Sequence, residues 1–193
     1  QLVDMSSSTV LPNEYDSPEN ILALEQVMTA QYVRAAKVNT TLWKMYTSSD
    51  LRRSKYFNQV TVSNILVAKG GSNQYSCSFR VGEIYLNAAE AALMTGESAM
   101  PAARTYLLTL IKQRYKAAAY TEKETAINAM GRDELLQEIY DERTRELAFE
   151  GHRWFDLRRT TRPRLEKTYS GTTYVLEEND SRYTTRIPSE AIE

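Results

Sequence analysis

Four glutamates recur every four residues along one stretch of the sequence: Glu138, Glu142, Glu146 and Glu150. On a helix, this spacing places the carboxylates one turn apart on nearly the same face. Paired carboxylates of this kind can bind a metal ion or share the acid–base work of glycoside hydrolysis. His152, the only histidine in the chain, follows directly. One interpretation of this stretch is therefore a catalytic centre.

A structural interpretation of the same stretch is the one we favour. Residues 142–160 read ERTRELAFEGHRWFDLRRT, so that several arginines are available to pair with the glutamates along and across a helix. Arg143 lies on an apolar stripe between Ile139 and Leu147, and a buried guanidinium needs carboxylates and carbonyl groups around it. We therefore expect no catalytic residue here, and expect the following residues to serve ion pairing and packing: Glu142, Arg143, Glu146, Glu150, Arg153, Trp154 and Asp156.

Other chemistries find less support in the composition. Cys77 and His152 could form a nucleophile–base pair, but nothing in the sequence places them together. A lone cysteine excludes an internal disulfide and a multi-cysteine zinc site, and we predict neither a metal nor a cofactor. A basic run at 158–164 could hold a nucleic acid. The net charge of −1, from 24 Lys and Arg against 25 Asp and Glu, argues against that partner.

Aromatic residues in the first sixty positions suggest a different kind of site. A flat ring on an irregular, solvent-facing segment can stack on the apolar face of a sugar. The alternative is that these rings simply pack against the rest of the protein. Because an exposed tryptophan is costly to keep without a use, Trp43 is the first candidate for glycan binding, followed by Tyr46 and Tyr32.

The elements that must position these residues are predicted to be mainly helical. Ser17 followed by Pro18 is typical of a helix start, and this first helix is predicted to reach about Gln31. A turn is expected at 47–50 and a strand over 60–68.

A pair of helices is predicted in the middle of the chain. The first begins near Ser78 and ends at Thr95-Gly96, with an inner face formed by Val81, Ile84, Tyr85, Ala88 and Ala92. The second begins at Ser98, with an inner face formed by Ala103, Leu107, Leu110 and Arg114. Two antiparallel helices joined by a short connection form a hairpin of tetratricopeptide type, which needs stacked neighbours to bury its faces.

The last third of the chain is predicted to be helical and then extended. A short helix is expected over 121–130, a long one over 133–150, and another turn or two over 154–157. The runs 172–177 and 182–187 flank a polar turn and predict a C-terminal β-hairpin.

Several of these segments, in this order, resemble the SusD/RagB family. The resemblance rests on FRVGEIYLNAAEAALMTG at 79–96, a helix ending LIKQRY, ELLQEIYDERTRELAFEGHRWFDLRRT at 134–160, and IPSEAI near the end. SPENILALE and SSDLRRSKYF fit the same pattern upstream. Members are glycan- or nutrient-binding lipoproteins on the surface of Bacteroidetes-type outer membranes. The resemblance implies a mainly α fold: a tetratricopeptide-like helical hairpin scaffold with irregular loops and a small C-terminal β-hairpin.

The same resemblance implies a function. Such a protein captures an oligosaccharide or other nutrient without catalysis and passes it to a SusC-like TonB-dependent outer-membrane transporter. Its ligand is held by loop aromatics and polar groups, away from the helix at 134–160. The alternatives are a tetratricopeptide-like protein-interaction scaffold and, with less support, a carboxylate-dependent hydrolase.

Family members are longer than this chain, so the resemblance implies that residues 1–193 form a C-terminal half. Within it we expect a loop-rich, ligand-side segment (1–75), a helical scaffold (76–160) and a β-hairpin tail (161–193). The N-terminal half would be a partner of this one and would carry the lipid anchor that holds the protein at the cell surface.

Overall fold

The computed structural model describes residues 1–24, 37–69 and 77–184. It divides into two compact units, Gln1–Glu150 and Gly151–Glu193. Helices dominate both the element order and the core, so the prediction of a mainly α fold with small β-hairpins is confirmed. No helix within the described ranges is long and apolar enough to cross a membrane. The expected division of the chain at residues 75 and 160 stays a prediction.

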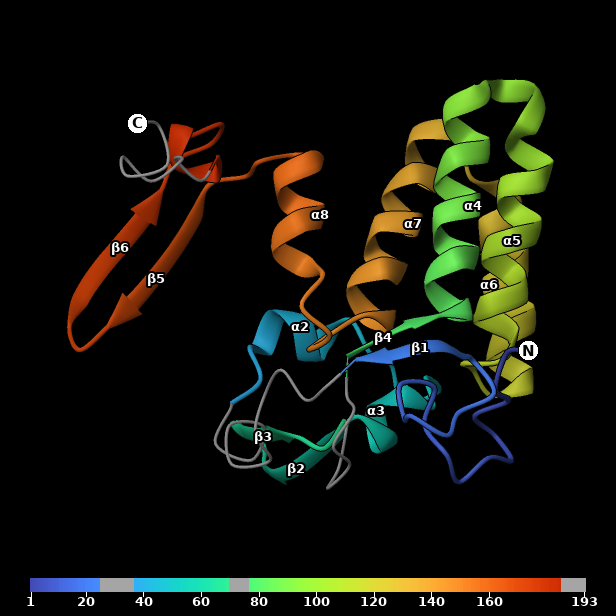
Figure 1. The fold of residues 1–193 in the computed structure, drawn as a ribbon, viewed down its shortest axis with the longest axis horizontal. Helices are drawn as coiled ribbons and strands as arrows, with labels where there is room; N and C mark the ends of the chain where they lie inside the picture. Colours follow the sequence, from blue (N-terminus) through green and yellow to red (C-terminus); the bar gives the residue numbers. More distant parts are fainter. Residues whose placement is uncertain (25–36, 70–76, 185–193) are drawn as a thin grey trace. The chain divides into compact units, whose positions relative to one another are not determined.

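Four helices build the body of the first unit. Helices α4 (Val81–Thr95) and α5 (Met100–Lys112) form the predicted hairpin, joined through the short 3₁₀ helix η1 (Glu97–Ala99). Helix α6 (Ala117–Ala129) packs against α5, and α7 (Arg132–Glu146) packs mainly against α4 (Figure 1). The hairpin therefore finds neighbours on two sides within this chain.

Apolar side chains from these helices form one continuous core. The predicted inner face of α5 is confirmed, because Ala103, Leu107 and Leu110 are fully buried there. The predicted face of α4 is wrong by one residue: the buried positions are Gly82, Leu86, Ala89 and Leu93, whereas Ile84 is exposed. Helix α4 carries apolar or small residues around most of its circumference, so its periodicity alone could not distinguish two adjacent stripes.

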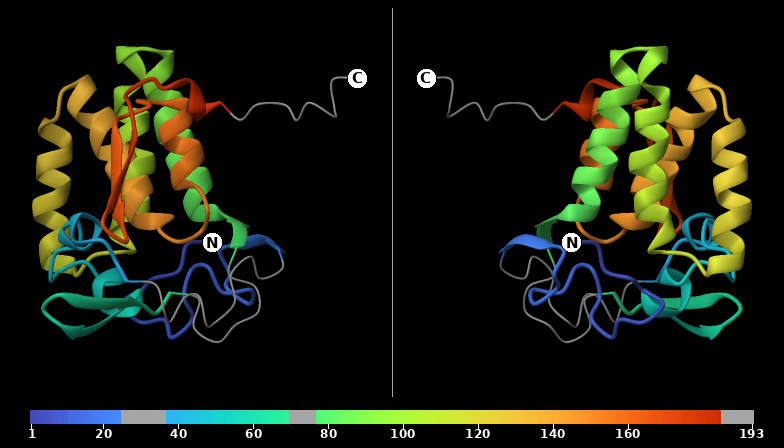
Figure 2. Two further views of the ribbon diagram at one scale, coloured as in Figure 1. Left: turned by 90° about the vertical axis from the view of Figure 1, so that its left-hand side faces the viewer. Right: turned by 90° about the vertical axis from the view of Figure 1, so that its right-hand side faces the viewer.

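Short strands and helices make up the rest of the first unit. Strand β1 (Asn20–Leu24) pairs antiparallel with β4 (Cys77–Arg80), and β2 (Phe57–Thr61) pairs antiparallel with β3 (Asn64–Val67). Between them lie α2 (Thr40–Lys44) and α3 (Arg52–Lys55), with the predicted turn closed by the Asp50 N–H donating to the Thr47 carbonyl. This loop-rich part lies beyond one end of α4 and α5, as both views show (Figure 2).

Two predictions for this part of the chain are wrong. The expected helix from Ser17 is a turn followed by β1, since the Ser17 hydroxyl accepts from the Glu19 N–H and the next residues pair with β4. Long-range pairing thus outweighs the local helix-start signal; residues 25–36 lie outside the described part. The single strand expected over 60–68 is a hairpin, because the Thr61 hydroxyl accepts from the Asn64 N–H and reverses the chain.

Helix α7 has the predicted stripe, but it ends earlier than expected. Leu135, Ile139, Arg143 and Leu147 are all buried, as predicted. The helix stops at Glu146, and Phe149 takes a left-handed conformation with φ of 64°. Lys69 Nζ donates to the carbonyls of Glu146 and Ala148, at 2.8 and 2.9 Å. A cation from another segment therefore satisfies carbonyls that a helix end leaves without partners.

The second unit begins with α8 (Arg153–Arg159) and continues into a β-hairpin of β5 (Leu165–Tyr169) and β6 (Thr172–Leu176). The prediction paired 172–177 with 182–187 instead, which is wrong: Ser181–Tyr183 is a 3₁₀ helix, and 185–187 lie outside the described residues. The turn at Ser170-Gly171 has positive φ at both positions, 48° and 78°. This is the geometry that two-residue hairpin loops favour, and glycine adopts it without strain.

Close packing at Gly82 gives a first prediction. A Cβ atom at this position would lie 2.5 Å from Arg80 Nη1 and 3.0 Å from Glu146 Oε1, both of which are fully buried. We expect Gly82→Ala to lower the free energy of unfolding by about 2–4 kcal/mol, since the added methyl group has to displace a buried ion pair. Chemical denaturation measures the change.

Gly131→Ala is the matched control, because the nearest atom to a Cβ there is 3.8 Å away. At this helix N-cap the same substitution should cost no more than about 1 kcal/mol. Equal losses in the two variants would show that the crowding at Gly82 does not matter.

Candidate functional site

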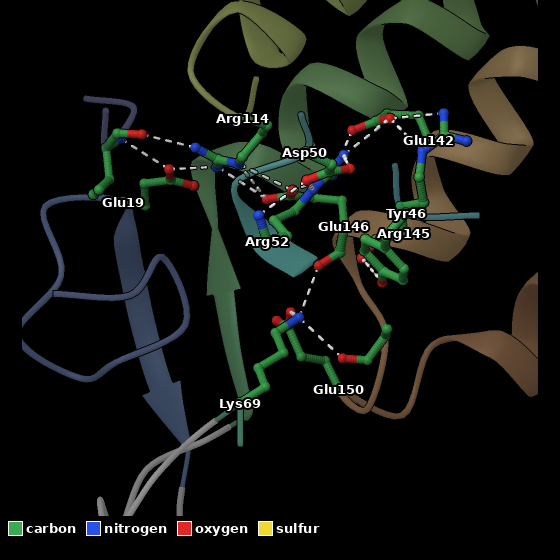
Figure 3. A network of polar contacts seen from close by, with 12 residues as sticks. Glu19, Tyr46, Asp50, Arg52, Lys69, Arg114, Glu142, Arg145, Glu146 and Glu150 are labelled. Atoms are coloured by element: carbon green, nitrogen blue, oxygen red, sulfur yellow. Dashed lines mark hydrogen bonds and ion pairs between the residues drawn. The ribbon is translucent and has the colours of Figure 1, made fainter. Parts of the chain in front are cut away.

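Three glutamates of the row, Glu142, Glu146 and Glu150, lie in a buried network of ion pairs inside the first unit (Figure 3). Glu138 lies at its edge, half-buried, and pairs with Lys123 and Arg145 at 2.9 and 2.7 Å. Every member of the network is buried, and carboxylates and cations occur in equal number. The carboxylates are Glu19, Asp50, Glu142, Glu146 and Glu150, and the cations are Arg52, Lys69, Arg80, Arg114 and Arg145. Because the charges cancel, the network adds no net charge to the interior.

Glu146 is the centre of this network. Its carboxylate accepts from Arg114 through Nε (to Oε2, 3.0 Å) and Nη2 (to Oε1, 2.9 Å). Arg80 Nη1 donates to Oε1 at 2.6 Å, and Arg52 Nη1 donates to Oε2 at 2.9 Å. Three guanidinium groups from three separate segments thus converge on one side chain that has no exposed surface.

Arg52 links the centre to the loop-rich part. Its guanidinium binds Asp50 through Nε and Nη2, at 2.9 and 2.8 Å, and Glu142 Oε1 through Nη1, at 2.6 Å. Glu142 in turn accepts from Arg145 Nε at 2.8 Å. Each oxygen of Glu142 therefore has a cationic donor, and the short helix α3 is fixed to α7.

The other end of the row is held in the same way. Glu150 accepts from Arg80 through Nε, at 2.9 Å, and through Nη2, at 2.8 Å, and it also accepts from Lys69 Nζ. Glu19 accepts from Arg114 Nη2 at 2.6 Å and from the Val3 N–H at 2.9 Å, which fixes the first residues of the chain.

The electrostatics of the network keep its carboxylates ionised. Burial alone would raise the pKa of Glu146, but Arg114, Arg80 and Arg52 together lower that pKa well below 4.5. The pKa values of Glu142 and Glu150 are lowered in the same way, against burial, by their arginine and lysine partners. Burial lowers the pKa of Lys69 to about 8, with Glu150 opposing the shift.

This arrangement suits a structural role. A general acid at neutral pH needs a raised pKa and access to a substrate, whereas these carboxylates have lowered pKa values and are enclosed by donors. Among the described residues, no group of three His, Cys, Asp or Glu side chains could hold a metal ion.

The other residues that were expected to form ion pairs or to pack differ in their burial and in their contacts. Arg143 is buried, and its Nη1 donates to Asn87 Oδ1 at 2.6 Å. In the second unit, Asp156 accepts from Arg159 Nη2 at 2.8 Å, and Arg153 is exposed at the start of α8. Trp154 stacks on Tyr183, with ring centroids 5.1 Å apart.

Sequence reasoning identified three carboxylates of the network, Glu142, Glu146 and Glu150, but it missed Glu19 and Asp50 and most of the cationic partners. Of the arginines it expected, Arg145 does pair with Glu142. The main donors, however, are Arg52, Lys69, Arg80 and Arg114. One signal was available: Arg114 lies on the predicted inner face of α5, where an unpaired cation would be costly. The others lie in loops and at element ends, where no periodicity marks them.

A pocket of about 430 Å³ opens in the loop-rich part of the first unit. Trp43 lines it from α2, and Arg53 and Ser54 line it from α3. The other lining residues are Ser48, Asp50, Leu51, Phe57, Gln59 and Lys116. The pocket thus combines an aromatic wall with hydroxyl, amide and charged groups, which is a suitable composition for a polar ligand with apolar faces.

The structure places the three aromatic candidates differently. Trp43 is half-buried, and the Arg53 guanidinium lies 4.1 Å from its ring centroid. Tyr46 was expected to stand clear of the protein, but its ring is fully buried and its hydroxyl donates to the Arg145 carbonyl at 2.7 Å. Tyr46 cannot stack on a ligand, because it anchors α2 to the helical body. Tyr32 lies outside the described residues.

The central position of Glu146 gives a second prediction. Glu146→Gln replaces a carboxylate oxygen with an amide NH₂ group, so that donors face donors in a closed space. We expect a loss of about 3–5 kcal/mol in the free energy of unfolding, as for the removal of one partner from a buried ion pair.

Glu177→Gln is the control for this measurement, since Glu177 pairs with Arg164 at 3.3 Å on the surface of the second unit. It should change the free energy by less than about 1 kcal/mol. A Glu146→Gln protein as stable as Glu177→Gln would contradict the central role of Glu146.

The lowered pKa values give a third prediction, on acid stability. The unfolded chain takes up protons near the ordinary glutamate pKa of 4.5, whereas folded Glu142, Glu146 and Glu150 take them up only at lower pH. Their contribution to stability is therefore complete above about pH 5 and is lost as the pH falls below 4.5. Denaturation at a series of pH values should show unfolding free energy falling between pH 5 and 3, with a shallower fall in Glu146→Gln. A free energy independent of pH in this range would be evidence against the ionised network.

Comparison with known proteins identifies the fold. The sequence matches the SusD family over residues 10–191. Among curated proteins, no sequence matches the chain.

Two solved structures from Bacteroides vulgatus ATCC 8482 share the fold. A SusD-like carbohydrate binding protein aligns with all of this chain and 50% of its own, at 18% identity and a TM-score of 0.63. A SusD superfamily protein aligns with 84% of this chain and 40% of its own, at 20% identity and a TM-score of 0.57. The chain therefore spans half or less of the length of these two proteins. Since the sequence match extends over nearly all of its residues, the chain belongs to the SusD family.

Proposed function

We propose that this chain is part of a cell-surface protein that captures oligosaccharides, and that the pocket at Trp43 is a contact point for the sugar. The observation that carries this assignment is the pocket itself: a half-buried tryptophan beside exposed hydroxyl and amide groups, in a chain of the SusD family. Aromatic rings stack on sugars, and neutral polar groups bind hydroxyls directly or through water.

Family membership supports the rest of the proposal. The protein acts at the outer membrane through a lipid anchor and hands its ligand to a SusC-like TonB-dependent transporter. It has no catalytic role of its own. One solved structural relative is a SusD-like carbohydrate binding protein, and we extend carbohydrate as the ligand class from that relative to this chain.

We also propose that an N-terminal half completes the protein, since the solved relatives are at least twice as long. The outer surface of the α4–α5 hairpin exposes Ile84, Met94 and Tyr106. A further helical hairpin would cover such side chains, as repeats do when they stack. The same surface would suit a tetratricopeptide-like interaction scaffold that binds peptides, which is the second candidate function.

Removal of the Trp43 ring tests the sugar contact. Trp43→Ala in the intact protein should weaken glycan binding by about 1–3 kcal/mol, a range taken from base–aromatic stacking. A glycan array identifies the ligand, and calorimetry measures the change in affinity.

Trp154→Ala is the matched control, because Trp154 stacks on Tyr183 in the second unit and does not line the pocket. It should leave the affinity unchanged. If Trp43→Ala binds as tightly as the parent protein, or if both variants lose binding equally, Trp43 is a packing residue and the pocket is not the sugar site. Binding to peptides but to no glycan would favour the interaction scaffold.

A further inference from the structure

The charges that line the Trp43 pocket indicate the class of sugar. Three charged residues line it: Asp50, Arg53 and Lys116. Asp50 is 2% exposed, and both of its carboxylate oxygens accept hydrogen bonds from Arg52, from Nε at 2.9 Å and from Nη2 at 2.8 Å. Its negative charge is thus neutralised inside the protein. The charges that remain to face a ligand are those of the two cations.

Arg53 is held in a fixed position at the pocket wall. Its guanidinium stacks over the Trp43 ring at 4.1 Å, and its Nη1 donates to the Tyr46 carbonyl at 2.6 Å. Its other N–H groups have no hydrogen-bond or ion-pair partner in residues 1–24, 37–69 and 77–184. A planar guanidinium fixed in this way is prepared to bind a carboxylate or sulfate with two donors.

Lys116 brings a second cation to the same pocket. Its backbone N–H donates to the Ser49 carbonyl at 3.0 Å, which ties the start of α6 to the turn beside the pocket. The side chain is exposed, and it makes no ion pair within the described ranges. Two cations without acidic partners at one pocket raise the local concentration of anions and favour a negatively charged ligand.

The position of Arg53 also disfavours a neutral sugar. Because the guanidinium covers one face of Trp43, that face is closed to a pyranose ring. An acidic sugar would bind the edge of the guanidinium and use only the remaining part of the indole. From this geometry we infer that the pocket takes an oligosaccharide that carries carboxylate or sulfate groups, which Arg53 and Lys116 bind while Ser48, Ser54 and Gln59 meet its hydroxyls. The inference rests on the proposed function.

Matched pairs of oligosaccharides test this inference in the intact protein. One pair is oligogalacturonides and their methyl esters, and the other is chondroitin sulfate oligosaccharides and their desulfated, carboxyl-reduced forms. In at least one pair, calorimetry should show the acidic member binding about tenfold more tightly, the effect of one or two charge-assisted hydrogen bonds. The preference should shrink as salt is raised, because exposed charges are screened.

Substitutions test which residues bind the acidic groups of the sugar. Arg53→Met and Lys116→Met should each lower the affinity for the acidic member, and should lower the ratio of that affinity to the affinity for its neutral counterpart. Lys112→Met removes the same charge from a neighbouring lysine that does not line the pocket, and should change neither.

Three results would overturn the inference. If the neutral members bind as tightly as the acidic ones and Trp43→Ala abolishes both, the pocket takes neutral sugars and the proposed function stands. If the preference for acidic sugars is equal in the Lys112→Met, Arg53→Met and Lys116→Met proteins, the acidic group is bound elsewhere. If the protein binds none of these sugars, and no glycan on an array, the proposed function fails together with the inference.

Discussion

A single buried carboxylate, Glu146, holds together segments that are far apart in the sequence. It receives arginine side chains from α3, from the end of β4 and from the residues that follow α5. Burying an ionised carboxylate is very costly unless strong donors surround it, and each of these guanidiniums has the same requirement for acceptors. The donors and acceptors satisfy one another only when all these segments are in place together. The first unit therefore depends on complete assembly of the network.

The network also explains how a loop-rich segment acquires a fixed structure. The described residues before α4 have little regular structure, and their apolar cluster around Tyr46, Tyr56 and Phe57 is separate from the helical core. Arg52 and Lys69 connect this segment to α7 with charged hydrogen bonds, which have more specific geometry than apolar contacts. Asp50 belongs to both the network and the pocket wall. One wall of the pocket is therefore fixed by the ion pairs of the network.

Much of the helical fold could be predicted from the sequence, because its signals are local. The limits of α4 and α5 follow from Gly96 and Pro101, and the buried stripe of α7 follows from its periodicity. The helix expected at Ser17 failed because pairing with β4 decides the structure of the following residues. The C-terminal hairpin was placed one strand too late, because the Ser170-Gly171 turn was missed.

The candidate site was less predictable than the fold, for a related reason. The spacing of the glutamates showed that they share a face, but their partners are contributed by distant segments and no local pattern identifies them. Whether an aromatic ring is exposed depends in the same way on distant contacts. Trp43 and Tyr46 are three residues apart and cannot be distinguished by the sequence around them. In the structure the Tyr46 hydroxyl donates to the buried Arg145 carbonyl, whereas Trp43 lines the pocket.

The convergence of three arginines on Glu146 has a consequence for how this protein can change over time. Loss of Glu146 would leave three buried guanidiniums short of an acceptor, and loss of any one of the arginines would leave Glu146 short of a donor, so an acceptable change would have to alter several residues at once. Ser48, Ser54 and Gln59 at the pocket are exposed, and their side chains lie outside the network. They can be exchanged one at a time at little cost to stability. The architecture thus separates a part that resists mutation from an adjoining surface on which a new ligand preference can arise by single steps.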